Sequence, residues 1–176
     1  VKNILSSMNS NKSAGADALP PRLLRASANA ISKPLSRIIN QSLQTGVFPT
    51  AFKEAKVLPL FKSGAASDIN NYRRISILPA LSKVVERVVH NQLSNYLEEN
   101  NLLTKCQFGF RKERSTERAA TVFLDEVVRF DIERGMLVTA LFLDLSKAFD
   151  TVSHSKLLDK LVSYGIKEIE FSWFCD

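Results

Sequence analysis

One aspartate at the end of an apolar run is the residue of this chain best placed to bind a metal ion. Residues 136–145 are almost wholly apolar apart from Asp144, and such a run is typical of a strand that is covered on both faces. An ionised carboxylate is costly to bury unless it is paired, hydrogen-bonded or bound to a cation. Hard divalent cations such as Mg²⁺ take carboxylate oxygens together with substrate phosphates. Asp144 is therefore a candidate metal ligand, and the alternative is that it caps the following turn together with Ser146.

A second carboxylate, Asp150, follows six residues later, directly after Phe149. Its side chain can cap the turn between Thr151 and Ser155 or accept hydrogen bonds from backbone amides there. A turn-stabilising role is the prediction for Asp150.

Two cations, Lys62 and Arg73, lie near the two ends of a polar loop. If the segments on either side pair as strands, both cations converge on one region and can bind a triphosphate. The simpler interpretation, a solvated loop base with ordinary surface cations, is favoured when these residues are considered alone.

A basic loop interleaves two aromatic residues with three cations. Aromatic stacking combined with neutralised phosphates is how single-stranded nucleic acids are bound. The two phenylalanines can equally fill the core at the start of a helix, and the sequence leaves both interpretations open. The segment reads Gln107-Phe108-Gly109-Phe110-Arg111-Lys112-Glu113-Arg114-Ser115.

Composition and charge limit the possible classes of protein. The chain has 176 residues, 45% of them apolar, and a net charge of +6, which predicts one domain, or one and a part, with a real core. Residues 1–118 carry eighteen basic and eight acidic side chains, whereas residues 119–176 carry six and ten. A basic body beside an acidic segment suits a polyanion-binding surface next to a cation site, although an uneven surface charge alone would look the same.

Other features of the sequence indicate an intracellular protein without a zinc cluster. Cys106 and Cys175 are too few for a disulfide framework. His90 and His154 are expected to be structural, because no His/Cys set has the spacing of zinc ligands. We find no signal peptide or membrane-length apolar segment, and the chain reads as an excerpt from a longer protein.

The elements that must position these residues predict an α+β fold. Helices are expected to start at Pro20-Pro21 and at Ser32-Lys33-Pro34, the second ending at Gly46. Strands over 56–62 and 75–78 form a hairpin with a long, mobile tip. Further helices are expected over 80–97, from a cap at Ser115 or Thr116 to Gly135, and over 155–164, with a strand over 136–145. The helix before Gly135 is expected to bury Ala119, Ala120, Phe123, Leu124, Val127 and Val128.

In their order, these motifs resemble the reverse transcriptases of non-LTR retrotransposons of the LINE type, and in particular the jockey-like group. The matching segments run in the family order with family-like spacing and cover nearly the whole chain. They are Asn11–Pro20, Phe48–Gly64, Asn71-Tyr72-Arg73-Arg74-Ile75-Ser76-Ile77-Leu78, Gln107–Thr116 and Phe142–Val152.

The resemblance implies the fingers and the first part of the palm of a right-hand polymerase. Residues 1–52 would be a helical extension of the fingers, 53–118 the fingers, and 119–176 the start of the palm. The remaining palm and thumb would follow in the full-length polyprotein, and the protein would act in the nucleus and cytoplasm. The activity would be RNA-directed DNA polymerisation by two-metal nucleotidyl transfer, with an RNA template, a DNA primer, deoxynucleoside triphosphates and Mg²⁺ or Mn²⁺.

The resemblance also implies a role for each matching site residue. Asp144 would bind the catalytic metals, and Leu145 would lend its backbone carbonyl to one of them. Phe149 would be the aromatic gate that selects deoxyribose over ribose. The remaining roles belong to four cations: Lys62 and Arg73 on the incoming triphosphate, and Arg111 and Arg114 near the template.

Some positions depart from the family pattern. Arg74 stands where the family usually has proline, and Ala16 and Ala18 where proline and glycine are common. The second pair of catalytic carboxylates that the family carries does not occur in this chain, so we expect residues 1–176 alone not to polymerise. The alternative function is an inactive element remnant that only binds nucleic acid, and group II intron-type and telomerase-type polymerases resemble the chain less well.

Overall fold

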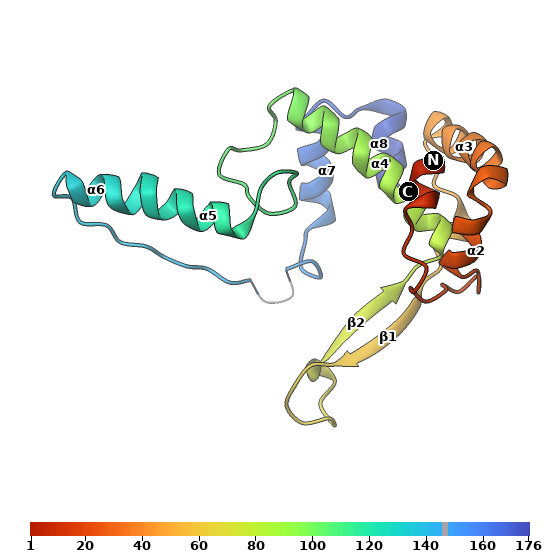
Figure 1. Cartoon of the computed structure of the whole chain (residues 1–176), viewed down its shortest axis with the longest axis horizontal. Helices are drawn as coiled ribbons and strands as arrows, with labels where there is room; N and C mark the ends of the chain where they lie inside the picture. The colour runs from red at the N-terminus through yellow and green to blue at the C-terminus, as the bar shows by residue number, and fades with distance from the viewer. Residues whose placement is uncertain (146–147) are drawn as a thin grey trace. The chain divides into compact units, whose positions relative to one another are not determined.

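The computed structural model describes residues 1–145 and 148–176, which form two compact units. The first unit comprises residues 1–95 and 155–176, and the second comprises residues 96–154. The predicted α+β class is confirmed, since the described elements are helices and a two-stranded antiparallel sheet. Their order is α1 (Lys2–Ser6), α2 (Pro21–Ala26), α3 (Ala28–Thr45), η1 (Thr50–Phe52), β1 (Lys56–Phe61), η2 (Ile69–Asn71), β2 (Tyr72–Ile77), α4 (Ala80–Glu99), α5 (Thr116–Val122), η3 (Phe123–Arg129), α6 (Phe130–Glu133), α7 (His154–Ser163) and α8 (Glu168–Cys175) (Figure 1).

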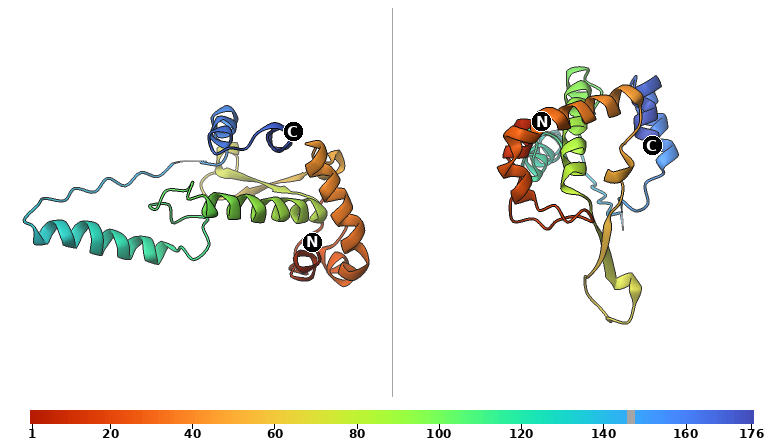
Figure 2. Two further views of the ribbon diagram at one scale, coloured as in Figure 1. Left: turned by 90° about the horizontal axis from the view of Figure 1, so that it is seen from above. Right: turned by 90° about the vertical axis from the view of Figure 1, so that its right-hand side faces the viewer.

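The predicted hairpin is confirmed, with β1 and β2 paired antiparallel from Lys56 opposite Ile77 to Phe61 opposite Tyr72. It extends away from helices α1 to α4 of its own unit (Figures 1 and 2). All six residues of β1 are exposed, so neither face of this sheet is covered by the described residues. Backbone pairing and cross-strand contacts therefore shape the hairpin more than core burial does.

Helix α3 begins earlier than the sequence predicts. It starts at Ala28 and carries Pro34 inside the helix, although an internal proline costs roughly 3 kcal/mol. The helical spacing of apolar residues continues upstream of the proline, with Ala28 and Leu35 both buried in the core. Burial of this longer face offsets the cost of Pro34, and Gly46 ends the helix in the left-handed conformation as expected.

The core of the first unit joins the N-terminal helices to α4 and α8. Helix α4 contributes the apolar stripe that its sequence predicts. Helix α8, which the sequence analysis did not predict, contributes Trp173. The buried members of the core are Leu5, Leu24, Ala28, Leu35, Ile39, Ala80, Val84, Val85, Val89 and Trp173.

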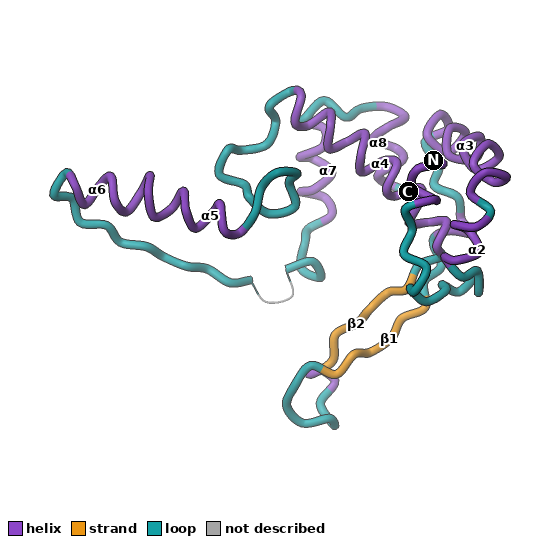
Figure 3. The backbone as a smooth tube through the Cα atoms, in the orientation of Figure 1, coloured by secondary structure: helices purple, strands orange, loops and turns teal. Residues whose placement is uncertain are grey.

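In the second unit, α5, η3 and α6 follow one another as a single helical rod (Figure 3). Ser115 caps it, since the Arg118 amide donates to its hydroxyl oxygen over 3.1 Å. The middle section η3 is π-helical. The predicted burial of this face is wrong, since α5 has no buried residue and Leu124 is 57% exposed. Ala119, Phe123 and Val128 are half-buried, and the ring of Phe123 meets that of Phe142 edge to face with centroids 6.0 Å apart. The side chain of Val127 lies outside the described residues.

The predicted strand over residues 136–145 is absent from the structure. The segment is extended but has no strand partner among the described residues. Leu137, Leu141, Phe142 and Leu143 are each more than 80% exposed. An extended segment becomes a sheet strand only when a neighbour satisfies its backbone N–H and C=O groups, and within residues 1–145 and 148–176 no segment does so here.

Candidate active site

Lys62 and Arg73 lie on the same face of the hairpin. Arg73 pairs with Leu60, and the pairing continues past β1 because the Lys62 amide donates to the Asn71 carbonyl over 2.8 Å. Since side chains alternate between faces, Lys62 shares the face of Leu60 and lies diagonal to Arg73, a relation that spaces residues by roughly 7–8 Å. Both side chains are exposed. The structure thus brings the two cations together, while their nucleotide-binding role stays a prediction.

The neighbouring cation, Arg74, lies on the other face of the hairpin, because it pairs with Pro59. The position at which the chain departs from the family pattern therefore leaves the face of Lys62 and Arg73 unchanged.

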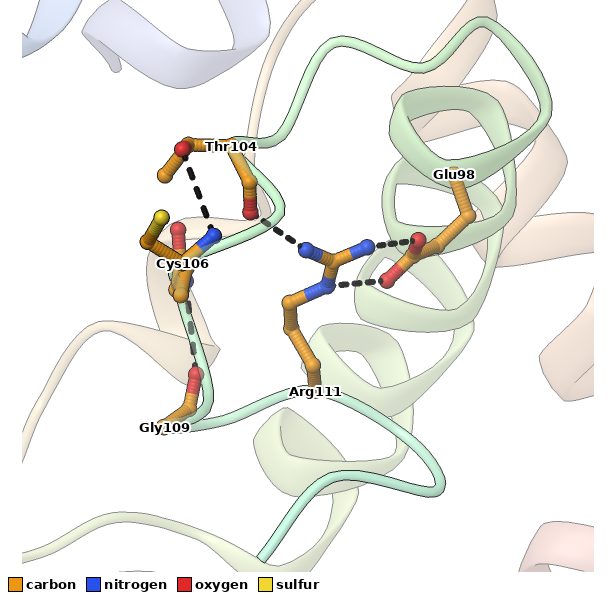
Figure 4. A network of polar contacts seen from close by, with 6 residues as sticks. Glu98, Thr104, Cys106, Gly109 and Arg111 are labelled. Carbon is orange, nitrogen blue, oxygen red and sulfur yellow. Dashed lines mark hydrogen bonds and ion pairs between the residues drawn. The ribbon is translucent and has the colours of Figure 1, made fainter. Parts of the chain in front are cut away.

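Arg111 binds within its own unit through all three guanidinium nitrogens. Its Nε donates to Glu98 Oε1 over 2.8 Å, its Nη2 to Glu98 Oε2 over 2.5 Å, and its Nη1 to the Thr104 carbonyl over 2.7 Å. Figure 4 shows the guanidinium between the carboxylate and the carbonyl. The side chain of Arg111 is only 10% exposed. Arg111 therefore ties the basic loop to the end of α4, and a template contact for it stays a prediction.

The pair of Arg111 and Glu98 changes the titration of both groups. The hydrogen bond from Arg111 lowers the pKa of Glu98, against a smaller opposing effect of desolvation, and the charges of Arg111 and Arg114 lower it further. The same hydrogen bond raises the pKa of Arg111. Glu98 was missed in the sequence, where its one signal is an acidic residue in the last turn of a helix that precedes a basic loop.

Arg114 and Phe108 form a cation–π contact, with the guanidinium carbon 5.3 Å from the ring centroid. Phe108 is half-buried, whereas Phe110 is 91% exposed. A core-filling role is therefore wrong for Phe110. Its ring instead meets Phe149 edge to face, with centroids 5.9 Å apart.

The residues of the predicted metal site lie in exposed segments of the second unit. Asp144 is exposed, and Leu145 and Phe149 are 74% and 80% exposed. Asp150 lies in a turn over residues 148–151, and its role in stabilising the turn from Thr151 to Ser155 stays a prediction. Ser146, the turn partner considered for Asp144, lies outside the described residues. The buried environment expected for Asp144 is wrong here, because the strand that would bury it does not form.

The donor groups at this position suit a hard divalent cation, since a carboxylate and a backbone carbonyl are both oxygen ligands. Within residues 1–145 and 148–176, no three His, Cys, Asp or Glu side chains gather in a group that could hold a metal ion. Asp144 and Leu145 therefore do not enclose an ion by themselves, and their metal-binding role stays a prediction.

The sequence matches known polymerases along most of its length. Residues 61–175 match the family described as reverse transcriptase (RNA-dependent DNA polymerase). The chain belongs to the reverse transcriptase family. The resemblance inferred from the sequence motifs is thereby confirmed.

The relatives of this reverse transcriptase domain are proteins of non-LTR retrotransposons. The RNA-directed DNA polymerase from mobile element jockey of Drosophila melanogaster is 34% identical over 91% of this chain and 18% of its own length. The jockey protein of Drosophila funebris is also 34% identical, over 93% and 18%. A probable RNA-directed DNA polymerase from transposon BS of Drosophila melanogaster is 33% identical, over 85% and 17%. The chain thus spans about a fifth of the length of the curated relatives it matches.

None of the helices in the described part of this reverse transcriptase domain is long and apolar enough to cross a membrane.

Proposed function

We propose that the full-length protein containing this chain is an RNA-directed DNA polymerase. The observation that carries the proposal is the reverse transcriptase match over residues 61–175, together with 34% identity to the jockey polymerase over 91% of the chain. Its substrates are an RNA template, a DNA primer and deoxynucleoside triphosphates. The hairpin and basic loop belong to the fingers, Asp144 begins the palm, and the rest of the palm and the thumb lie in the full-length polyprotein. The protein acts in the nucleus and cytoplasm.

Asp144 and the carbonyl of Leu145 are proposed to hold the divalent cation, Mg²⁺ or Mn²⁺. When bound, such a cation supplies Lewis-acid stabilisation of the attacking and leaving oxygens. A single carboxylate fits this role because Mg²⁺ commonly takes one or two carboxylates and completes its shell with substrate phosphates and water.

Lys62 and Arg73 are proposed to bind the triphosphate of the incoming nucleotide. Their common face supports the proposal, because two exposed cations on adjacent strands can neutralise neighbouring phosphates. Phe149 is proposed to exclude the ribose 2′-hydroxyl, and its ring, which meets Phe110 at an edge, is 80% exposed.

Arg111 and Arg114 are proposed to lie near the template strand. Phosphate contacts by such cations supply most of the affinity for nucleic acids. Because the guanidinium of Arg111 is engaged by Glu98 and Thr104, Arg114 is the better candidate for a direct contact.

The substitution Asp144→Asn in the full-length protein tests the metal site. It removes one charge from the proposed cation site, and the loss of several kcal/mol of stabilisation corresponds to a roughly thousandfold slower reaction. Primer extension on an RNA template measures the effect.

Asp159→Asn is the matched control, because Asp159 is an exposed aspartate on α7 that is not among the proposed ligands. Extension at the normal rate by the Asp144→Asn variant would remove Asp144 from the metal site. A wild-type protein that binds primer-template without extending it would instead favour the inactive remnant.

A further inference from the structure

The tip of the hairpin is held by the two residues that end it. We define the tip loop as residues 63–71, which lie between Lys62 and the start of β2. The Asn71 side-chain amide donates to the Ala65 carbonyl over 2.9 Å, and the Tyr72 hydroxyl donates to the Ala66 carbonyl over 2.8 Å. The side chains of Asn71, which directly precedes β2, and of Tyr72, its first residue, thus bind two successive carbonyls in the first half of the loop. The long tip expected from the sequence is a hydrogen-bonded loop.

Asn71 and Tyr72 bind the loop from opposite faces of the hairpin. Tyr72 pairs with Phe61, and their rings meet edge to face with centroids 5.4 Å apart. Because neighbouring residues alternate between faces, this aromatic face is opposite to the face of Arg73. The Tyr72 hydroxyl therefore binds the Ala66 carbonyl from the aromatic face. Asn71, two residues before Arg73, binds the Ala65 carbonyl from the face of Lys62 and Arg73.

Two further features fix the conformation of the tip loop. Gly64 has φ of +95°, and a Cβ atom there would lie 2.6 Å from Nδ2 of Asn71, so a side chain at this position would displace the amide from its carbonyl. Asp68 caps the short helix η2, since its Oδ1 accepts from the Asn70 amide over 2.9 Å. Each half of the loop is thus fixed by its own local contacts.

We propose that Asn71 and Tyr72 are positioning residues for nucleotide binding, which fix the tip loop from the two faces of the hairpin and so keep Lys62 and Arg73 in place for a triphosphate. The backbone of Asn71 also fixes the loop, because its carbonyl accepts a hydrogen bond from the Lys62 amide where the loop begins. The inference rests on the proposed function of Lys62 and Arg73, and it assigns no contact with the nucleotide to Asn71 or Tyr72.

The test uses Tyr72→Phe and Asn71→Ala in the full-length protein. Tyr72→Phe keeps the ring contact with Phe61 and removes only the hydroxyl, whereas Asn71→Ala removes the other donor. Each variant is expected to raise the KM for a deoxynucleoside triphosphate by roughly three- to tenfold, the ratio that one hydrogen bond of this kind is worth. The kcat at saturating nucleotide is expected to stay near the wild-type value, because neither residue contacts the reacting atoms.

Asn70→Ala is the matched control, since the side-chain amide of Asn70 donates to Asp68 within the same loop; its KM is expected to stay unchanged. Arg73→Ala is the reference that loses a proposed triphosphate cation.

A raised KM for Arg73→Ala with an unchanged KM for both Tyr72→Phe and Asn71→Ala overturns the inference and leaves the proposed function intact. A lowered kcat at constant KM also overturns it, because that pattern indicates a general loss of structure. A wild-type protein that neither extends a primer nor binds a deoxynucleoside triphosphate overturns the proposed function and the inference together.

Discussion

At the scale of single residues, Glu98 decides what the arginines of the basic loop can do. It neutralises Arg111 through two hydrogen bonds and leaves the Arg114 guanidinium over the Phe108 ring. Two arginines that are three positions apart in the sequence therefore have different partners, a carboxylate and a backbone carbonyl for Arg111 and an aromatic ring for Arg114. The sequence predicts the basic character of this loop but cannot show which cation is paired, because the partner lies thirteen positions away on α4.

The pair of Glu98 and Arg111 predicts an acid-sensitive loop. Because the pKa of Glu98 is lowered in the folded protein, the pair contributes stability above the ordinary pKa of 4.5 and loses it as the pH falls through the lowered value. Arg111 stays charged throughout. Glu98→Gln is expected to lower the thermal unfolding temperature near neutral pH, and the difference from wild type is expected to vanish in acid.

Glu99→Gln is the matched control for this titration, because Glu99 is the neighbouring exposed carboxylate at the end of α4. It should lower the unfolding temperature less than Glu98→Gln. A difference between wild type and Glu98→Gln that persists unchanged in acid would show that the charge of Glu98 is not what stabilises the loop.

At the scale of elements, α8 is attached to α3 by a buried hydrogen-bond chain. The Trp173 indole Nε1 donates to Ser42 Oγ over 2.9 Å, and the Ser42 hydroxyl donates to the Val47 carbonyl over 2.6 Å. Ser42 is only 5% exposed. Ser42→Ala leaves a buried donor and a carbonyl without their partner, so it is expected to lower the free energy of unfolding by about 1–3 kcal/mol, as measured by urea denaturation.

Ser36→Ala provides the comparison, because Ser36 lies in the same helix and its hydroxyl donates only to the Ser32 carbonyl of its own helix over 2.7 Å. It is expected to change the free energy of unfolding much less. Equal effects of the two substitutions would mean that the contact with Trp173 adds nothing to the attachment of α8.

The elements that the sequence predicts well are those with a strong local pattern. The hairpin, α4 and α7 follow from alternation or from helical spacing bounded by turn residues, and the structure confirms them within a few positions. Helix α8 has apolar residues on several sides and so offers no stripe to detect. The predicted start of α3 is too late, because Pro34 favours a helix start locally. Packing of the preceding turns in the core instead lets the helix begin at Ala28.

The prediction of a strand over residues 136–145 is wrong for a different reason. Its composition is that of a buried strand, but strand formation depends on a neighbour that local sequence cannot supply. The location of Asp144 at the end of this segment could be predicted from the sequence, whereas its burial could not.

At the scale of the whole molecule, the described residues divide the proposed chemistry between two units. The proposed triphosphate cations, Lys62 and Arg73, belong to the first unit. Asp144, Phe149 and the arginines of the basic loop belong to the second.

This division predicts that residues 1–176 alone do not extend a primer. Asp144 lies in an extended segment whose apolar side chains are exposed, and the described residues gather no group of three metal-binding side chains around it. Since two-metal transfer needs its ligands held in a closed, dry site, an exposed single carboxylate gives no measurable rate. The experiment compares primer extension on an RNA template by this chain and by the full-length protein, with Mg²⁺ or Mn²⁺ supplied at equal concentration. Extension by the isolated chain that is lost on Asp144→Asn substitution would show that these residues already form a working site.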